Sequence, residues 1–269
     1  MAIEPAYKKN NIPVVFSVDD NYAPYLSVCL QSLISHSSNK YNYDIWILDG
    51  GLGKDRRTRI LKLINNVPNI SIRFFDIVSF SELDNYTFSI SNHASIANYY
   101  RLFIPTIFEN YTKLLYLDCD LLICRDVSQL YHTDLDGSML GAIKDACTYF
   151  NPEYWVPYCT RTLHLKDAHH YVNSGVLICD VAKMKAKHFT EKCLEKLKEF
   201  RPVCWDQCLI NAAFENDIKH LDLHWNFQWH WGLTEFTKKD LVYGEYHQKY
   251  FPALFLTFPL SSAPKFPEM

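Results

Sequence analysis

The sequence predicts an α/β protein in which a mainly parallel sheet is flanked by helices within a single compact domain. Short apolar runs alternate with amphipathic stretches along the first half of the chain, which is typical of successive β–α–β units. The chain has 269 residues, enough for one large domain. Hydrophobic residues make up 48% of it and charged residues 21%, so a sizeable core can form under an ordinary globular surface.

Four apolar runs predict the strands of the first half. They cover residues 13–18, 44–48, 70–75 and 113–117. The first run ends abruptly at Asp19-Asp20, and the fourth leads straight into Asp118-Cys119-Asp120. Because an open α/β sheet binds its ligands at the carboxyl ends of its strands, we expect a site where these acids gather.

Helices are expected between and after these strands. The first covers residues 22–34, where apolar residues recur at spacings of three and four, and Pro24 is tolerated in its first turn. Further helices are expected at residues 54–66, 95–104, 181–200 and 207–216, and further strands at 141–144 and 171–179. The lysines of the 181–200 helix are most simply a solvated face.

The last part of the chain differs in composition. After Val242 the sequence is rich in Pro and Phe, which predicts an irregular segment. We therefore expect one domain over residues 1–242 and an irregular C-terminal segment, 243–269, packed on it.

Composition also restricts the partners and the compartment. The formal net charge of −3 leaves no broad basic face, so no nucleic-acid partner is expected. The nine cysteines include no C-x-x-C pair, and several lie in apolar runs, which favours reduced thiols in a cytoplasmic protein. No apolar run reaches the roughly 18 residues of a membrane span, so at most peripheral membrane contact is expected.

The chemistry-bearing motif is a pair of aspartates. Neither G-x-G-x-x-G nor a P-loop motif occurs. The negative charge of a bound nucleotide diphosphate would therefore have to be neutralised by groups other than a glycine-rich loop. On an extended backbone Asp118 and Asp120 point the same way and can converge on one Mn²⁺ or Mg²⁺. A second D-x-D, Asp134-Leu135-Asp136, lies in a turn that ends at glycine and is interpreted as a capping or surface feature.

Several motifs, in order along the chain, carry a resemblance to a known family. They are residues 16–22 (FSVDDNY), 95–102 (SIANYYRL), 115–120 (LYLDCD), 172–176 (VNSGV), 205–207 (WDQ) and 225–226 (WN). Together they resemble the family 8 retaining glycosyltransferases, the group of bacterial lipooligosaccharide galactosyltransferases and glycogenin. The resemblance covers residues 12 to about 230.

The resemblance implies a Rossmann-like sheet of the glycosyltransferase A type and a retaining, metal-dependent reaction. The donor would be UDP-galactose or UDP-glucose, the cofactor Mn²⁺ or Mg²⁺, and the acceptor a saccharide or glycoconjugate, as in lipopolysaccharide synthesis. Two other functions stay open: a catalytically weak UDP-sugar-binding protein, and a nucleotidyltransferase, which also uses paired aspartates.

The resemblance also implies roles for donor-binding residues. The uracil and ribose would be held by Ser17, Asp19, Asn21 and Tyr22, although Asp19-Asp20-Asn21 also reads as a helix N-cap turn. Arg101 would contact the donor sugar and phosphates, with His93 near the sugar. The metal would be held by Asp118 and Asp120, and Cys119 lies between them in the donor site.

The implied reaction centre comes from the second half of the chain. Asp145 and Asn173 would hydrogen-bond the transferred hexose, and Gly175 would permit close backbone approach. Asp206 and Gln207 would lie at the face of the sugar where transfer occurs. Gln207 is a poor nucleophile, which favours attack from the front face, although Asp145 or Asp206 as nucleophile stays open.

The chain departs from the family near its C-terminus. The family places a histidine there as third metal ligand and a lysine on the diphosphate. Here an apolar residue stands at the histidine position, and Lys265 follows at the wrong spacing. His247 is the nearest histidine in sequence and is the candidate substitute.

Overall fold

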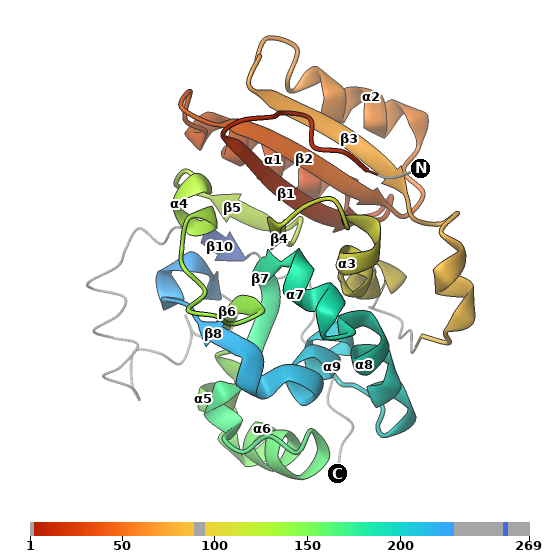
Figure 1. Ribbon diagram of the computed structural model, residues 1–269, viewed down its shortest axis with the longest axis vertical. Helices are drawn as coiled ribbons and strands as arrows, with labels where there is room; N and C mark the ends of the chain where they lie inside the picture. Colours follow the sequence, from red (N-terminus) through yellow and green to blue (C-terminus); the bar gives the residue numbers. More distant parts are fainter. Residues whose placement is uncertain (1–2, 89–94, 229–254, 258–269) are drawn as a thin grey trace.

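The computed structural model describes residues 3–88, 95–228 and 255–257, the last three by their backbone (Figure 1). Its central sheet has seven strands in the order β3-β2-β1-β4-β7-β6-β8. Their bounds are β1 Asn11–Val18, β2 Asn42–Asp49, β3 Ile70–Asp76, β4 Lys113–Leu117, β6 Leu140–Lys144, β7 Val172–Asp180 and β8 Ile218–His220. Only β7 runs antiparallel to its neighbours in this sheet, so the predicted mainly parallel α/β fold is confirmed.

Both faces of the central strands are covered. Val14, Phe16 and Val18 of β1 pack with helix α1 (Ala23–His36), whereas Val15 packs with residues of the opposite face. Successive side chains of a strand point to opposite faces, so β1 contributes to two separate cores. This explains why β1 reads as a continuous apolar run.

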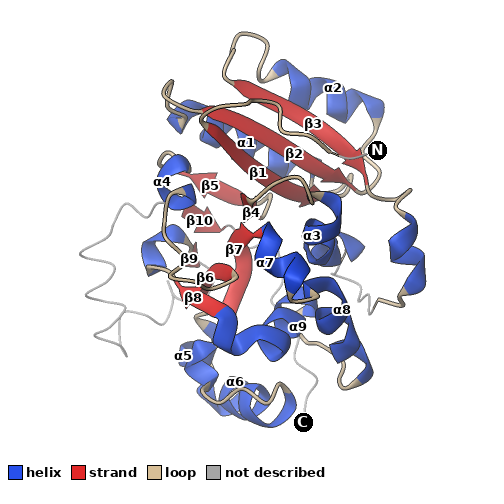
Figure 2. Cartoon of the chain, in the orientation of Figure 1, coloured by secondary structure: helices blue, strands red, loops and turns tan. Residues whose placement is uncertain are grey.

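The remaining helical elements connect and cover the strands (Figure 2). The α-helices are α2 Lys54–Lys62, α3 Ile104–Ile107, α4 Ser128–Tyr131, α5 Cys147–Phe150, α6 Pro152–Pro157, α7 Val181–Ala186, α8 Phe189–Glu195 and α9 Trp205–Phe214. The 3₁₀ helices are η1 Ser81–Asn85, η2 Ile96–Phe103, η4 Ala168–His170, η5 Lys196–Lys198, η6 Glu215–Asp217 and η7 Leu223–Trp225. One π-helical turn, η3, covers Tyr158–Thr162. In Figure 1, α2 lies at one end of the long axis and α6 near the other.

Two helix predictions need correction. The segment at 95–104 is a 3₁₀ helix, η2, that continues into the short α3. The single helix expected at 181–200 is wrong: the chain breaks at His188, whose φ of 56° is left-handed, and α8 starts afresh at Phe189. The break turns Phe189 into the core, where it is 1% exposed, and lets the Thr190 hydroxyl donate to the carbonyl of Leu102 (2.7 Å).

A second, three-stranded sheet has the order β5-β10-β9, formed by β5 Leu121–Ile123, β10 Phe255–Thr257 and β9 Phe227–Gln228. β10 is antiparallel to β5 and parallel to β9. The expectation of an irregular C-terminal segment is therefore wrong for residues 255–257. Backbone groups of β5 and β9 need hydrogen-bond partners, and β10 supplies them.

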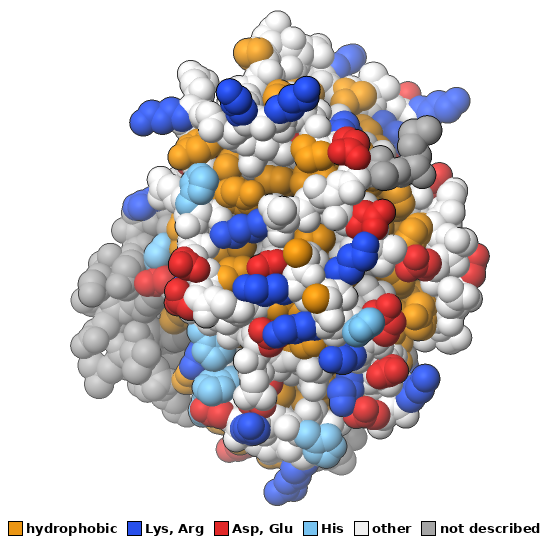
Figure 3. Space-filling model, in the orientation of Figure 1, with side chains coloured by type: hydrophobic (Ala, Val, Ile, Leu, Met, Phe, Trp, Pro, Cys, Tyr) orange, Lys and Arg blue, Asp and Glu red, His pale blue; other side chains and the backbone are white. Residues whose placement is uncertain are grey.

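The surface carries both signs of charge. On the face shown in Figure 3, Lys and Arg side chains are interspersed with Asp and Glu. Four lysines of the 181–200 segment pair with acidic side chains: Lys183 with Asp180, Lys185 with Glu109, Lys187 with Asp217 and Lys196 with Glu199. Within the described ranges, we find no helix with the length and apolarity required to cross a membrane.

A partly buried ion pair between Asp44 and Arg73 helps to tie the N-terminal segment to β2 and β3. Asp44 is fully buried, and its carboxylate accepts hydrogen bonds from Arg73 (2.5 Å), the Tyr111 hydroxyl (2.7 Å) and the backbone N–H of Ala6 (3.0 Å). The Arg73 guanidinium also stacks over the Trp46 ring at 4.1 Å. With Asn11 Nδ2 (3.5 Å) as the fourth donor, one carboxylate thus accepts hydrogen bonds from four groups at the amino end of the sheet.

Replacing this carboxylate tests its structural role. Asp44→Ala should lower the free energy of unfolding by about 2–4 kcal/mol, because it leaves buried donors and a partly buried cation without their partner. Glu199→Ala, which removes a half-exposed partner of Lys196, should cost less than about 1 kcal/mol. Denaturant unfolding of both variants measures the difference, and equal costs would contradict the assignment.

Candidate active site

The candidate site lies at one edge of the central sheet. Strands β1, β4 and β6 run in the same direction, so their carboxyl ends meet at this edge, and the antiparallel β7 begins there. Asp19, Asp118 and Asp145 each directly follow one of these strands. Topology therefore brings together residues that lie up to 126 positions apart in the sequence.

Asp118 is held by its neighbours on β4 and β7. Its backbone N–H donates to the carbonyl of Gly175 (2.8 Å), and its carboxylate Oδ1 accepts from the Tyr116 hydroxyl (3.2 Å) and from Arg101 Nη2 (3.0 Å). A Cβ atom at Gly175 would lie 2.6 Å from Asp118 Oδ2. Glycine at position 175 is therefore required for this carboxylate to keep its place.

Asp120 completes the acidic pair. Burial and the negative charge of Asp118 raise the pKa of Asp120 to about 7, against the opposing effect of Arg101. Cys119, between them, is buried, and burial followed by the charges of Asp120 and Asp118 raises the pKa of its thiol. Two carboxylates close enough to repel each other form an oxygen-donor set that suits a hard divalent cation.

The donor set fits Mn²⁺ or Mg²⁺ through these two carboxylates. Among residues 3–88 and 95–228, no cluster of three or more His, Cys, Asp or Glu side chains is arranged to hold a metal ion. Magnesium-type sites commonly use one or two protein carboxylates and complete their coordination with water and phosphate oxygens. The expected third-ligand candidate, His247, and the lysine at 265 lie outside the described residues, as does His93.

Arg101 is the buried cation of the site. It is 4% exposed, and its guanidinium pairs with Asp118 and, through Nε, with Asp206, both at 3.0 Å. Nη1 donates to the carbonyl oxygen of Ser174 (2.5 Å), and the guanidinium stacks over the Tyr116 ring at 4.2 Å. The planar fork of arginine makes these contacts together, which a lysine could not do.

Asp206, the second acid paired with this cation, lies in the first turn of α9. It is 2% exposed. Burial raises the pKa of Asp206 to about 6, although the charge of Arg101 opposes the shift. Asp206 does not cap the helix, because Cys204 is the N-cap residue of α9.

A chain of side-chain amides holds the predicted sugar-binding residues. Gln207 Nε2 and Asn173 Nδ2 both donate to Asp145 Oδ2, at 2.9 and 3.0 Å. Gln207 Oε1 accepts from the backbone N–H of Ser174 (3.1 Å), and Asn173 Oδ1 accepts from that of Gly175 (2.9 Å). Each of these side chains is therefore fixed by at least two hydrogen bonds.

Two further amides, Asn226 and Gln228, which were not predicted as site residues, extend this chain of hydrogen bonds. Asn226 Nδ2 donates to Asn173 Oδ1 (2.9 Å), and Gln228 bridges the backbone on both sides of Asp145, from Ala146 N–H to the carbonyl of Lys144. Asn226 was recognisable as part of the WN motif. Gln228 carries no sequence signal, because its partners are backbone groups 82 and 84 residues away.

The predicted nucleotide-binding residues follow β1. Ser17 is buried near the end of the strand, and Asp19 Oδ1 accepts from the N–H of Tyr22 (3.1 Å) in the turn before α1. The N-cap residue of α1 is Tyr22 and no side chain caps the helix, so the N-cap interpretation of residues 19–21 is wrong: Asp19 orders the turn that precedes the helix. Burial and then the negative charge of Asp120 raise the pKa of the Tyr22 hydroxyl, while the neighbouring Asn21 is exposed.

The second aspartate pair lies elsewhere. Asp134 Oδ1 accepts from the N–H of Asp136 (2.9 Å) within a turn, and the Asp136 carboxylate, 70% exposed, pairs with Lys219. Asp136 has a φ of 48°, and Gly137 follows with a φ of 86°. The structure thus places this pair in an exposed turn.

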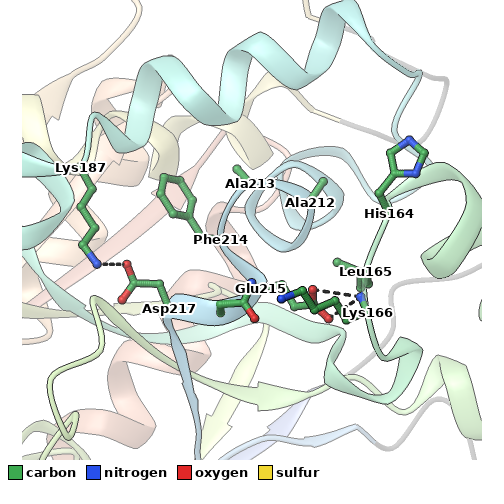
Figure 4. Close-up of a pocket in the computed structure, with 10 residues that line it drawn as sticks. His164, Leu165, Lys166, Lys187, Ala212, Ala213, Phe214, Glu215 and Asp217 are labelled. Atoms are coloured by element: carbon green, nitrogen blue, oxygen red, sulfur yellow. Dashed lines mark hydrogen bonds and ion pairs between the residues drawn. The ribbon is translucent and has the colours of Figure 1, made fainter.

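A pocket of about 440 Å³ lies at the far end of α9 (Figure 4). It is lined by His164, Leu165, Lys166, Lys187 and residues 212–217. Its acidic side chains are engaged, since Asp217 pairs with Lys187 and Glu215 accepts from the N–H of Lys166. It contains none of the predicted site residues, because Gln207 is at the opposite end of this helix.

Comparison with known proteins identifies relatives along most of the chain. Residues 13–249 match the family model described as glycosyl transferase family 8. The chain is 27% identical over 224 residues to General stress protein A of Bacillus subtilis, and 28% identical over 218 residues to a putative glycosyltransferase of Haemophilus influenzae. These alignments cover 80% of this chain in each case, and 73% and 62% of the two relatives.

Solved structures share the fold. The apo structure of the WbbM bifunctional glycosyltransferase superposes with a TM-score of 0.85 at 25% identity, covering 98% of this chain and 48% of that one. The galactosyltransferase LgtC, in complex with donor and acceptor sugar analogues, gives a TM-score of 0.75 at 22% identity, covering 96% and 90%. This chain spans about half of the WbbM chain.

Gly175→Ala tests the contact that positions Asp118. The added methyl would push the carboxylate away, so Mn²⁺ binding measured by titration calorimetry should weaken about 10–100-fold, the usual cost of disturbing the support of a ligand. Gly53→Ala is the matched control, because a Cβ there meets only Asp20 Oδ1 at 3.7 Å. Equal Mn²⁺ affinity in the two variants would remove the proposed role of Gly175.

Proposed function

This chain belongs to glycosyl transferase family 8 and is a glycosyltransferase, and we propose that it transfers a hexose, galactose or glucose, from a UDP-sugar to a saccharide or glycoconjugate acceptor with retention of configuration. The observation that carries this proposal is the edge of the sheet where Asp118 and Asp120 lie beside the buried Arg101. Paired carboxylates at strand ends, with no glycine-rich phosphate loop, favour a diphosphate bound through a divalent cation.

In this proposal Asp118 and Asp120 hold Mn²⁺ or Mg²⁺. The cation would supply positive charge to the diphosphate as the sugar leaves. The orientation of the Asp118 carboxylate is already fixed, since Tyr116 and Arg101 both bind its Oδ1 atom. Preorganised charge of this kind needs no rearrangement during the reaction.

The nucleoside would lie along the turn that follows β1. Ser17, Asp19, Asn21 and Tyr22 are assigned to the uracil and ribose. The negative charge of Asp120 acts on the Tyr22 hydroxyl, which supports a donor that runs from this turn to the acidic pair. His93 is assigned to the sugar from the sequence resemblance alone.

The transferred hexose would lie against Asp145, Asn173, Asp206 and Gln207. Asp145 already accepts hydrogen bonds from the N–H of Cys147, from Asn173 and from Gln207. Asp206 is paired with Arg101. Carboxylates engaged in this way are weakened as nucleophiles, because their negative charge is already stabilised.

These contacts favour attack from the front face of the sugar over a covalent intermediate. The acceptor hydroxyl would approach from the side of the departing diphosphate, which would take its proton. Gln207, with both ends of its amide bonded, would position the sugar. Transfer of a nucleotidyl group is not favoured, and release of UDP instead of pyrophosphate distinguishes the two reactions.

Asp120→Ala tests the metal assignment. Incubation with UDP-galactose or UDP-glucose and Mn²⁺ should give UDP release for the native chain and at least about a hundredfold less for the variant, because one of two ligands is lost. The circular dichroism spectrum and melting temperature should stay close to native. Asp134→Ala, in the second aspartate pair, is the control and should keep native activity. Equal rates of UDP release by Asp120→Ala and Asp134→Ala would contradict the metal assignment.

Asn226 is expected to position Asn173. Asn226→Ala removes the donor to Asn173 Oδ1 and should lower kcat by about tenfold while Mn²⁺ affinity is unchanged, since the metal pair is not touched. Asn42→Ala, which removes an amide donor to the carbonyl of Lys9 at the amino end of the sheet, is the control. If Asn226→Ala lowered Mn²⁺ affinity together with kcat, the variant would have disrupted the whole site, and the specific positioning role of Asn226 would be contradicted.

A further inference from the structure

Two cysteines bracket the Trp205-Asp206-Gln207 triplet. Cys204 is the N-cap residue of α9, and Cys208 lies one helical turn later. The backbone N–H of Cys208 donates to the carbonyl of Cys204 (3.2 Å), so the first turn of the helix begins and ends at a thiol. Nothing in the proposed transfer reaction uses either sulfur.

The sulfur of Cys208 is surrounded by hydrogen-bond donors. The N–H of Cys204 lies 3.2 Å from it, the Tyr171 hydroxyl 3.3 Å and the Tyr158 hydroxyl 3.6 Å. Cys208 and Tyr171 are both fully buried. Several donors around a single sulfur are the arrangement that stabilises a thiolate.

This environment sets Cys208 apart from the other cysteines. Burial alone would raise the pKa of its thiol, but hydrogen bonds from Cys204, Tyr171 and Tyr158 outweigh burial, so the pKa of Cys208 is lowered. The pKa of every other cysteine is raised, for most of them chiefly by burial; for Cys204 the largest cause is its hydrogen bond to Cys208. The nine cysteines are all free thiols in this structure.

The two sulfurs can reach each other. Residues four apart in a helix are separated by a rise of about 6 Å, and disulfides accept Cα separations of about 4.4–6.8 Å. Cys204 itself is not helical, with φ −113° and ψ 52°, so its side chain is not fixed by the helix. Cys204 is also partly exposed, which gives small oxidants access from its side.

We propose that Cys204 and Cys208 form a redox-active pair, which a hydroperoxide oxidises to a disulfide that closes around Asp206 and Gln207 and stops sugar transfer. The inference of lost activity rests on the proposed function; formation of the bond does not. The Cys208 thiolate attacks one peroxide oxygen, giving a sulfenic acid and hydroxide. The Cys204 sulfur then displaces the sulfenic oxygen as water, so two thiols and one hydrogen peroxide give one disulfide and two waters.

The disulfide would disturb the residues that support Asp145 and Gln207. Joining the sulfurs at about 2 Å removes the acceptor of the Tyr171 and Tyr158 hydroxyls. Tyr171 also supplies, through its carbonyl, the acceptor for the N–H of Asp145 (2.9 Å), and Gln207 directly precedes Cys208. Movement of both ends would break the hydrogen bond between Gln207 and Asp145, and displacements of about 1 Å cost rates on the order of a hundredfold.

Peptide mapping after treatment with hydrogen peroxide tests the bond itself. Trypsin does not cut between Arg201 and Pro202, so one peptide, residues 199–219, contains Cys204 and Cys208 and no other cysteine. Its mass should fall by two hydrogen atoms after oxidation and return after reduction with dithiothreitol. An unchanged mass, or cross-links from Cys208 to Cys147 or Cys159 instead, would overturn the proposal.

Activity measured on the same samples tests the consequence. UDP release by the oxidised native chain should fall at least about tenfold and recover with dithiothreitol. Cys208→Ser, which removes the thiolate that attacks the peroxide and keeps a polar atom beside the Tyr171 hydroxyl, should keep its activity through peroxide treatment. Cys124→Ser, a partly exposed cysteine elsewhere, should remain as sensitive as the native chain.

Two outcomes separate this proposal from the proposed function. Equal loss of activity in oxidised Cys208→Ser and native protein would overturn the switch. A native chain that never releases UDP when reduced would overturn the proposed function, while the mass of peptide 199–219 would still decide whether the bond forms.

Discussion

The site depends on one buried cation. Arg101 lies between Asp118 and Asp206, and removing either acid would leave a charge in the interior with an incomplete partner set. Isolated charges are costly to bury, so the three groups are mutually dependent. Because Asp118 belongs to the end of β4 and Asp206 to the first turn of α9, this ionic contact fixes the sheet edge against the helix that bears Gln207.

Much of the fold followed from the sequence. Buried parallel strands read as apolar runs because helices cover both faces, and the strands at 13–18, 44–48, 70–75 and 113–117 agree with β1 to β4. The break at His188 was missed because a lysine-rich helical pattern carries no sign that Phe189 must turn inward. Strand β10 was missed because three residues that complete a distant sheet have no periodicity of their own.

The site was predictable only in part. Acids at strand ends and motifs in the family's order led to Asp118, Asp145, Asn173 and Gln207, which the structure gathers at one sheet edge. The contacts that hold them were not predictable, since Gln228 and Asn226 act through partners distant in sequence. Local sequence reveals a reactive side chain more readily than the amide that orients it.

The place of β10 in the three-stranded sheet affects how the enzyme is made. It is hydrogen-bonded to β5, which follows Asp120 directly, and to β9, which follows Asn226 directly. Pairing of Phe255 with Ile123 closes a loop of more than a hundred residues, which is slow relative to local helix formation. During synthesis, β10 can join the two segments that flank the candidate site only after residue 257 has been added. The last strand of the central sheet, β8, ends at His220, so a nascent polypeptide can form its central sheet before this edge is complete.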